Sequence, residues 1–264
     1  MRSFRFSVLV AFSLISSLAA EAEPLGPRVH TSSSARDLNA LVLSLTRSMP
    51  TGGSYATTAA ANQLLQSAIT VSPSGLELEP ARAQPSYCSG ATYLVFLQVI
   101  QQLRERAGLV LDEKVTRALL VAGQADGYGV WGRWNANGPG TARLFHELDL
   151  GRNFLSYEEA RPGDFMKIFW TKEIGQRERG HSVIYLGTHA ENGVEMVRFW
   201  SSNQPDGYGE KSVPKAKVAI ALFSRLERPA NLQRLLTIPA RDPYLASLLT
   251  VRSSLPELKV KCGL

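Results

Sequence analysis

A run of apolar residues at helical spacing gives the clearest structural signal in the chain. It extends from Pro85 to Leu103, and from Tyr93 onward its apolar positions lie almost all the way around a helix. A surface helix would keep one broad polar face, so this pattern predicts a buried helix. Cys88 lies in the first turn of that predicted helix.

Shorter patterns flank this segment. Apolar residues spaced as on one helix face predict further helices at about residues 35–48, 55–69, 112–122 and 141–148. Residues 127–140 mix glycine and aromatic residues without a regular period, which predicts a loop. Trp131 and Trp134 in this loop either line a groove for a sugar or peptide or cap the hydrophobic core, and both interpretations fit the sequence.

Beyond residue 160 the period changes from helical to alternating. After a turn at residues 161–164, four short runs rich in β-branched and aromatic residues predict strands at residues 165–170, 182–187, 194–200 and 217–223. Asn192-Gly193, a dipeptide favoured in hairpin turns, joins the second run to the third. We therefore expect an antiparallel meander and, with the helices, an α+β fold.

The N-terminus has the features of an export signal. Arg2 and Arg5 precede an apolar run that is short for a bilayer span, and Ala20-Glu21-Ala22 fits a cleavage site. We expect residues 1–22 to be a signal peptide and the mature protein to be periplasmic or extracellular. No later stretch has the length and apolarity that predict a transmembrane segment.

The rest of the chain is expected to form one main domain with additions at both ends. Residues 23–84 would be a leader and helical extension, residues 85–225 the main domain, and residues 226–264 a proline-containing tail. The formal net charge is +6, or +5 once the signal peptide is removed, and this basic balance favours anionic partners such as a cell wall. No nucleic-acid-binding motif occurs, so we do not expect a nucleic acid partner. The oligomeric state is left open.

Cys88 and Cys262 are the only two cysteines in the sequence. They are too few for a disulfide-stapled scaffold, although an oxidising compartment would allow them to pair. Alternatively Cys88 is a reactive thiol, because the free N–H groups and partial positive charge at a helix N-terminus favour the thiolate.

A nucleophilic cysteine needs a base and a group that orients the base. His181 directly precedes the second predicted strand. A two-residue turn at Asn192-Gly193 would place it opposite about Gln204, and a turn one or two residues earlier would place it opposite about Ser201. Ser201 and Asn203 share one face of the strand. We choose Asn203 as the orienting residue and Ser201 as the runner-up, because an amide reaches further and holds one imidazole tautomer.

Four motifs in this order carry a family resemblance. They are Tyr87-Cys88-Ser89-Gly90-Ala91 opening a helix, Arg161-Pro-Gly-Asp164-Phe165 opening a strand, Gly180-His-Ser-Val-Ile-Tyr-Leu-Gly187, and a polar residue on the following strand. Together they resemble the papain-like fold of NlpC/P60 and CHAP cell-wall amidases and endopeptidases, over about residues 85–223. The chain departs from the pattern in its long interval before the Pro-Gly-Asp turn and in a Ser-Ser-Asn cluster at the third position.

The resemblance implies a papain-like α+β domain, in which the buried Cys88 helix packs on an antiparallel sheet and extra helices precede it. It implies Cys88 as the nucleophile, His181 as the base and Asn203 as the third catalytic residue. Support for the oxyanion or the imidazole would come from the neighbouring residues Tyr87, Ser86 and Ser201. The implied reaction is acyl transfer to water through a thioester, with no metal or other cofactor, on amide bonds in peptidoglycan peptide stems.

Two alternatives remain open at this stage. One is a catalytically inactive module that binds cell wall or glycan and contains a Cys88–Cys262 disulfide. The other is an exported protease or transamidase that acts on proteins. A free and reactive thiol at Cys88 would separate an enzyme from the disulfide-containing module.

Overall fold

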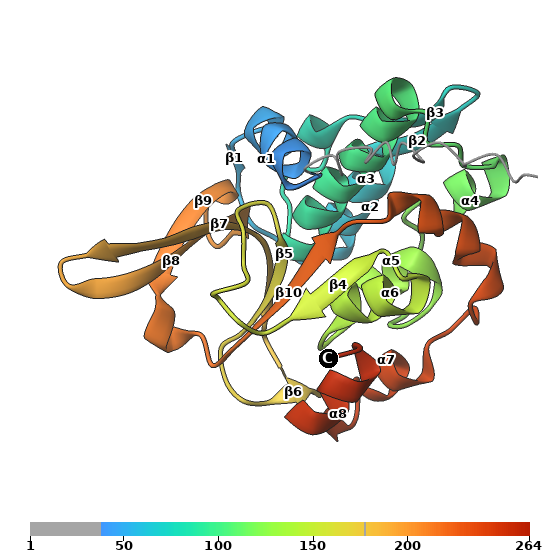
Figure 1. Ribbon diagram of the computed structural model, residues 1–264. Coiled ribbons are helices and arrows are strands. Elements are labelled where there is room, and N and C mark those ends of the chain that lie inside the picture. The colour runs from blue at the N-terminus through green and yellow to red at the C-terminus, as the bar shows by residue number, and fades with distance from the viewer. Residues whose placement is uncertain (1–37, 177) are drawn as a thin grey trace, which may run out of the picture. The chain divides into compact units, whose positions relative to one another are not determined.

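The computed structural model describes residues 38–176 and 178–264 (Figure 1). These residues belong to one compact unit. The expected signal peptide, residues 1–22, and the leader up to residue 37 lie outside the described residues. The boundaries expected near residues 84 and 225 fall inside the compact unit. The helical extension and the tail are therefore parts of the same unit as the residues between them.

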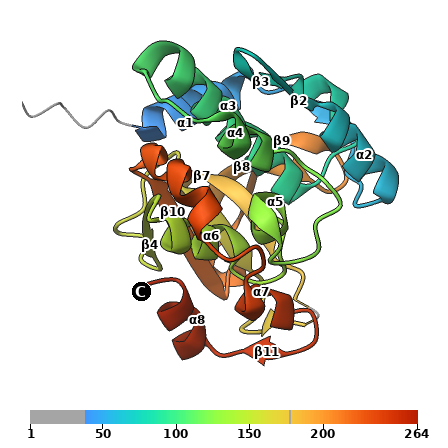
Figure 2. The ribbon, with the colours of Figure 1, turned by 90° about the vertical axis from the view of Figure 1, so that its right-hand side faces the viewer.

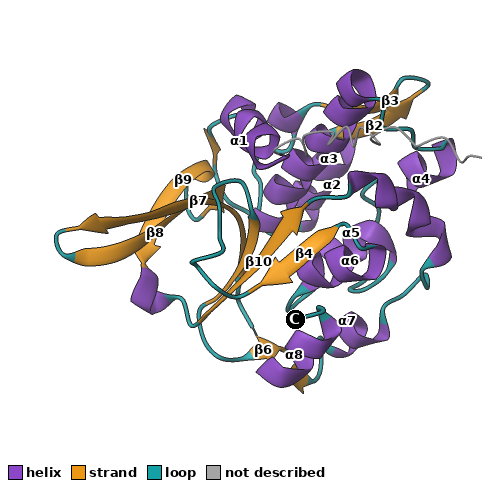
Figure 3. Cartoon of the chain, viewed as in Figure 1, coloured by secondary structure: helices purple, strands orange, loops and turns teal. Residues whose placement is uncertain are grey.

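Helices gather on one side of the fold, as Figure 3 shows. The α-helices are α1 (Leu38–Ser48), α2 (Ala59–Ser67), α3 (Cys88–Ala107), α4 (Glu113–Ala118), α5 (Gly129–Trp134), α6 (Gly140–Leu148), α7 (Pro243–Ser247) and α8 (Leu255–Lys261). Short 3-10 helices occur at Pro80–Arg82, Lys215–Lys217 and Pro229–Thr237. Among the described residues no helix is both long and apolar enough to cross a bilayer.

Helix α3 is the buried helix that the sequence predicts. Every residue from Ser89 to Leu97 is buried, and the helix packs on α1 and on two central strands of the sheet. It ends at Gly108, whose φ of 69° is a left-handed conformation that glycine adopts without steric cost. Because α3 is in contact with other elements on several sides, apolar residues are found nearly all the way around it. The prediction of a buried helix is confirmed.

The main sheet has the strand order β1-β9-β8-β7-β5-β10-β4, and all of its pairs are antiparallel. Its strands are β1 (Gly52–Gly53), β4 (Gly151–Phe154), β5 (Phe165–Phe169), β7 (His181–Glu191), β8 (Val194–Asn203), β9 (Gly207–Pro214) and β10 (Ile220–Leu226). Two small pairs join β2 (Ile69–Ser72) to β3 (Gly75–Leu78) and β6 (Ile174–Gly175) to β11 (Arg252–Ser253). The fold is therefore α+β, as expected.

Each face of the sheet has its own apolar core. Ile184 on β7 and Trp200 on β8 belong to the larger cluster, which they share with α3. Figure 2 views this side and shows helices in front of the strands. Alternate residues such as Val183 and Phe199 belong to a second cluster on the other face, where Tyr157 and other loop residues pack against it. The two-residue alternation along the strands thus separates a helix-covered face from a loop-covered face.

The strand connectivity differs from the predicted meander in one respect. The last predicted strand, residues 217–223, corresponds to β10, which pairs with β5 and β4 and not with β8. The place beside β8 is taken by β9, residues 207–214, which the sequence pattern did not predict. Its glycines and charged residues hide the apolar alternation that identifies the other strands.

The hairpin between β7 and β8 turns at Asn192-Gly193, as predicted. A β-bulge between Tyr185 and Gly187 adds one residue to β7. Beyond the bulge the pairing is therefore shifted by one residue, with Ile184 opposite Trp200. This shift determines which residue lies opposite the start of β7.

Residues 127–140 contain α5 and are not simply a loop. Trp131 is 1% exposed and packs against Tyr93 with 5.2 Å between ring centroids. Trp134 is 2% exposed and packs against Phe96 at 4.8 Å. Of the two interpretations left open by the sequence, the core interpretation therefore applies to Trp131. Trp134 is likewise a core residue, although it borders the cavity described below.

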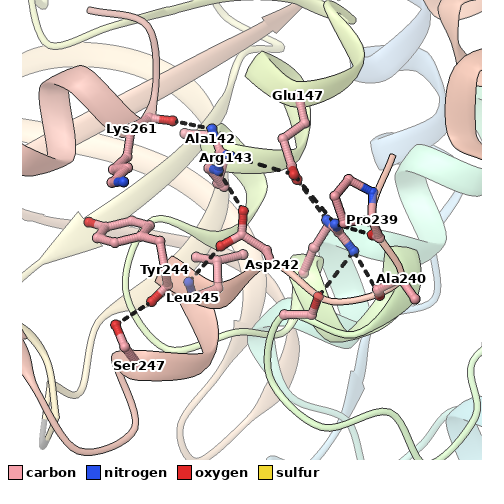
Figure 4. A network of polar contacts seen from close by, with 12 residues as sticks. Ala142, Arg143, Glu147, Pro239, Ala240, Asp242, Tyr244, Leu245, Ser247 and Lys261 are labelled. Atoms are coloured by element: carbon pink, nitrogen blue, oxygen red, sulfur yellow. Dashed lines mark hydrogen bonds and ion pairs between the residues drawn. The ribbon is translucent and has the colours of Figure 1, made fainter. Parts of the chain in front are cut away.

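Buried ion pairs join the C-terminal tail to helices α5 and α6. Arg133 on α5 is fully buried, lies 2.6 Å from Glu147 on α6, and donates to the carbonyl of Pro239 in the tail. Arg143 on α6 pairs with Asp242 of the tail at 2.7 Å (Figure 4). A buried arginine without its partners would be strongly destabilising, so the tail is an integral part of the fold.

Both cysteines are free thiols. Cys262 directly follows α8 and is 1% exposed in a small cluster that includes Phe169 and Leu258. Burial raises the pKa of its thiol to about 12. The Cys88–Cys262 disulfide considered above is thus absent from the structure, and the binding-module alternative loses the pairing on which it depended.

Candidate active site

Cys88 is the first residue of α3, and its side chain is half-buried. The preceding residue, Tyr87, is extended with φ −142° and ψ 163°, so the chain enters the helix at the cysteine itself. The N–H groups of Cys88 and Ser89 lie in the first turn, where an α-helix offers them no carbonyl acceptor. These donors are available to an atom bound beside the thiol.

His181 is the first residue of β7. Past the bulge, Ile184 lies opposite Trp200, and continuing this register places His181 opposite Asn203 and not opposite Gln204. The distance from His181 Nε2 to Asn203 Oδ1 is 3.1 Å. The structure thus brings together the two residues that the sequence selected as base and orienting group.

The amide of Asn203 is held in one orientation. Its Nδ2 donates to the carbonyl of Gly209 at 2.7 Å and to that of Ser201 at 3.3 Å. Since the NH₂ group points toward these carbonyls, Oδ1 faces the imidazole and accepts from Nε2–H. This arrangement assigns the ring proton to Nε2 and leaves Nδ1 of His181 to interact with the thiol.

The thiol of Cys88 lies within interaction range of the His181 side chain. Burial by itself raises the pKa of the thiol. The positive charge of His181 and its hydrogen bond act in the opposite direction, helped by the N–H of Ser182 and by the charge of Lys167, and together they lower the pKa from 9.0 to about 6. At neutral pH the group is therefore mostly thiolate, the nucleophilic form.

Tyr55 is a further residue at the thiol that the sequence analysis missed. Its hydroxyl interacts with Cys88, and burial, followed by the charge of Cys88, raises the pKa of this hydroxyl so that it remains a protonated donor. Tyr55 is brought there by the preceding strand β1, which pairs with β9, and by a hydrogen bond from its N–H to the carbonyl of Pro205 at 3.0 Å. The Gly52-Gly53 pair signals a turn in the sequence, but nothing in the sequence links it to β9.

The hydroxyls of Tyr87 and Ser86 have partners other than Cys88, His181 and Asn203. Tyr87 donates to Asn62 Oδ1 at 2.8 Å, and Ser86 donates to Ser202 Oγ at 2.8 Å. Ser86 therefore anchors the segment before α3 to strand β8. The two hydroxyls for which the resemblance implied oxyanion support are thus bonded to Ser202 and Asn62, whereas the hydroxyl of Tyr55 interacts with Cys88.

Ser201, the runner-up for the orienting role, acts on the backbone of β7. Its Oγ donates to the carbonyl of Ser182 at 2.7 Å. It thereby supports the residue that follows His181, but it makes no hydrogen bond to the imidazole itself.

Two aromatic side chains flank the imidazole. The ring of Trp170 lies nearly parallel to that of His181, with 6.4 Å between centroids and 25° between planes. The ring of Phe199 meets it edge-on at 5.7 Å and 73°. Trp170 is 36% exposed and covers one face of the imidazole, so the two rings restrict its rotation.

A buried ion pair fixes the loop that leads into β7. Lys167 Nζ lies 2.9 Å from Glu178 Oε1, and the two side chains are 14% and 2% exposed. Glu178 also accepts from the N–H of Gly180 at 2.7 Å. Gly180 has no room for a side chain, because a Cβ there would lie 2.6 Å from the carbonyl oxygen of Ile168. Residues 178–180 are therefore held in one conformation where they enter β7.

Two adjoining cavities open at Cys88 and His181. One, of about 430 Å³, is lined by Cys88, and the other, of about 560 Å³, is lined by His181. Tyr55, Thr57 and Gly180 contribute to the walls of both. A substrate could therefore place one part on each side of the thiol and imidazole.

The arrangement offers a nucleophile, a base, an orienting amide and hydrogen-bond donors for a negatively charged oxygen. Within residues 38–176 and 178–264, no group of three or more His, Cys, Asp or Glu side chains is placed to hold a metal ion. The chemistry available from these side chains is nucleophilic attack by a thiolate with proton transfer through an imidazole.

Comparison with known proteins adds no relative on which to base an assignment. No protein-family model, curated protein or solved structure matches the chain. Any function must therefore be argued from the residues of the site themselves.

Proposed function

We propose that this protein is a cysteine hydrolase of papain-like fold that cleaves amide bonds. One observation carries the proposal: His181, whose Nε2 is held by Asn203, lies beside Cys88 and lowers the pKa of its thiol. A nucleophile, a base and an orienting group in this sequence of contacts are the parts that acyl transfer requires. The likeness of the four sequence motifs to NlpC/P60 and CHAP enzymes supports the same reaction class.

In the first step the Cys88 thiolate attacks the carbonyl carbon of a bound amide. The carbonyl oxygen becomes negatively charged, and donors near the sulfur stabilise it. The N–H of Cys88 at the helix start and the hydroxyl of Tyr55 are the groups available for this role. Because they are already in place before the reaction, little reorganisation is needed as the charge develops.

In the second step His181 gives a proton to the leaving amine, the C–N bond breaks, and a thioester to Cys88 remains. A water molecule then takes the place of the amine. His181 removes a proton from this water as it attacks the thioester, which releases the acid and restores the thiolate. Asn203 keeps the imidazole in one tautomer and one orientation through both transfers.

The proposed substrates are the peptide stems of peptidoglycan. The expected export signal and the net charge of +6 favour an anionic polymer outside the cytoplasm. Each cavity, at about 430 and 560 Å³, falls in the usual range of ligand-binding clefts and could hold a few amino acid residues of a stem peptide.

The test is digestion of purified peptidoglycan and of soluble stem peptides by the mature protein, read out by mass spectrometry of the products. We expect new amine and acid termini with the wild type and with Cys262→Ala, and none with Cys88→Ala. Cys262→Ala is the matched control because it removes the other thiol, which is buried away from the cavities. Cleavage that persists in Cys88→Ala would refute the proposed mechanism.

A further inference from the structure

The cavity at His181 carries positive charge that no carboxylate balances. Arg179 and Lys211 both line it, and among the described residues neither forms an ion pair. Its other walls include the apolar side chains of Trp170 and Phe199. A ligand in this cavity would therefore meet two cations beside an apolar surface.

The position of Lys211 follows from the strand register. Lys211 on β9 pairs with Phe199 on β8, the residue whose ring contacts His181. Its Nζ donates to the carbonyl of Gln204 at 3.2 Å, directly after Asn203 in the chain. The ammonium group thus lies near the Asn203 end of the catalytic group.

The cavity at Cys88 has the opposite character. Its charged wall residues are Asp126, Glu178 and Lys167. Lys167 lies 2.9 Å from Glu178, so Asp126 is a second acidic residue in a wall with a single cation, although the more distant Arg241 also acts on it. The two cavities therefore differ in sign, and a substrate that spans them would have a preferred direction.

The chemistry assigns a role to each cavity. The thioester carbonyl must remain bonded to Cys88, so the acyl part of the substrate occupies the cavity lined by Cys88. The imidazole must reach the leaving nitrogen to protonate it, so the leaving amine occupies the cavity lined by His181.

We infer that the leaving amine carries a carboxylate, as an amino acid or an acidic peptide does, and that Arg179 and Lys211 bind this group. The inference rests on the proposed function, because it needs a thioester at Cys88. It names the part of the substrate that determines specificity on the leaving side. Guanidinium and ammonium groups bind carboxylates through charge-assisted hydrogen bonds.

The reverse of the amine-leaving step provides the test. An uncharged activated ester, N-acetylalanine 4-nitrophenyl ester, acylates Cys88 and releases 4-nitrophenol. An added amine then competes with water: its nitrogen attacks the thioester, a C–N bond forms, the C–S bond breaks, and His181 takes the proton lost by the nitrogen. The amine must enter through the cavity lined by His181, so the rate of its capture reports how well that cavity binds the amine.

The measured quantity is the ratio of capture by an amine with a free carboxylate to capture by its amide. Alanine is paired with alaninamide, and alanylalanine with its amide, so that the carboxylate is tested at two distances from the amine. We expect the wild-type protein to capture the carboxylate-bearing amine preferentially in at least one pair. The double variant Arg179→Gln, Lys211→Gln should lower that preference roughly three- to tenfold, and added salt should also lower it. The acylation rate cancels within each ratio of two amines on one variant, and dividing that ratio by the ratio for uncatalysed aminolysis of a simple thioester removes the difference in amine basicity.

Arg198→Gln is the matched control. Arg198 lies on β8 next to Phe199 but lines neither catalytic cavity, and its removal should leave the ratio unchanged. The inference is overturned if the wild type shows no preference for either carboxylate, or if the double variant retains the preference. Release of 4-nitrophenol at the same rate by wild type and Cys88→Ala would overturn the proposed thioester itself, so the two failures are distinguishable.

Discussion

Replacing His181 with alanine should convert Cys88 from thiolate to thiol at neutral pH. Burial raises the pKa of this thiol, and His181 supplies the largest opposing contributions, through its charge and its hydrogen bond. With the imidazole gone, the burial effect remains, and we expect the pKa to rise from about 6 to about 9. A rise of that size corresponds to about 4 kcal/mol of lost preference for the thiolate.

The assay is the rate of alkylation of Cys88 by iodoacetamide as a function of pH, read from the modified peptide by mass spectrometry. Since the thiolate is the reactive form, the rate rises with pH and its midpoint gives the pKa. The midpoint is more informative than the rate at one pH, because a more basic thiolate is also a stronger nucleophile and partly offsets its lower population. Cys262 should remain unlabelled in the folded protein, since its thiol is buried with a pKa of about 12.

His189→Ala is the matched control, because it removes an exposed histidine from the same strand, β7. We expect its midpoint to stay near the wild-type value of about 6. The electrostatic reasoning would be refuted by a midpoint near 6 in His181→Ala, or by a wild-type midpoint near 9. Circular dichroism of each variant would establish that the fold is retained.

Three further outcomes test the rest of the site. Asn203→Ala should lower kcat about ten- to hundredfold with little change in KM, because the imidazole loses its orientation but not its contact with the thiol; an unchanged kcat would remove Asn203 from the mechanism. Tyr55→Phe should slow acylation by an activated ester about a hundredfold, whereas Tyr87→Phe should not, and equal effects would count against Tyr55 as an oxyanion donor. Gly180→Ala should reduce the free energy of unfolding in urea by about 1–3 kcal/mol through overpacking, while Gly123→Ala, which has open space around it, should change it little.

The parts of the fold that could be predicted are those with strong local periodicity. Helix α3 is apolar on nearly all sides, so it had to be buried, and the Asn192-Gly193 turn determined how β7 and β8 begin to pair. Strand β9 escaped prediction because its sequence lacks apolar alternation, and its pairing with β8 is a tertiary contact. Local pattern thus identifies elements, but it does not determine which of them become neighbours.

The candidate site was predictable to a similar degree. Cys88 and His181 could be selected because each begins a strongly patterned element. The choice of Asn203 depended on the hairpin register, and simple counting gave Gln204 or Ser201 as the opposite residue. One bulged residue in β7 accounts for the difference, and a bulge of this kind has no reliable local sequence signal.

Tyr55 could not be predicted for a different reason. It reaches the thiol because β1 pairs with β9, two segments more than 150 residues apart in the chain. The burial of Trp131 is likewise a property of the assembled fold, since α5 is packed between α3 and the tail residues that bind Arg133. Glycine and aromatic residues in an irregular segment are typical of both a buried helix turn and an exposed binding loop.

The two cysteines illustrate why a helix terminus alone does not make a thiol reactive. Cys88 begins α3 and Cys262 directly follows α8, and burial raises the pKa of both. They differ in their neighbours: Cys88 has His181, which lowers its pKa to about 6, whereas Cys262 has only the weaker opposing effect of Arg143 and keeps a pKa of about 12. The reactivity of Cys88 therefore depends on the strand register that brings the imidazole to the helix start. A change that shifts β7 by one residue would turn His181 to the other face of the sheet and leave Cys88 a half-buried thiol without the group that lowers its pKa.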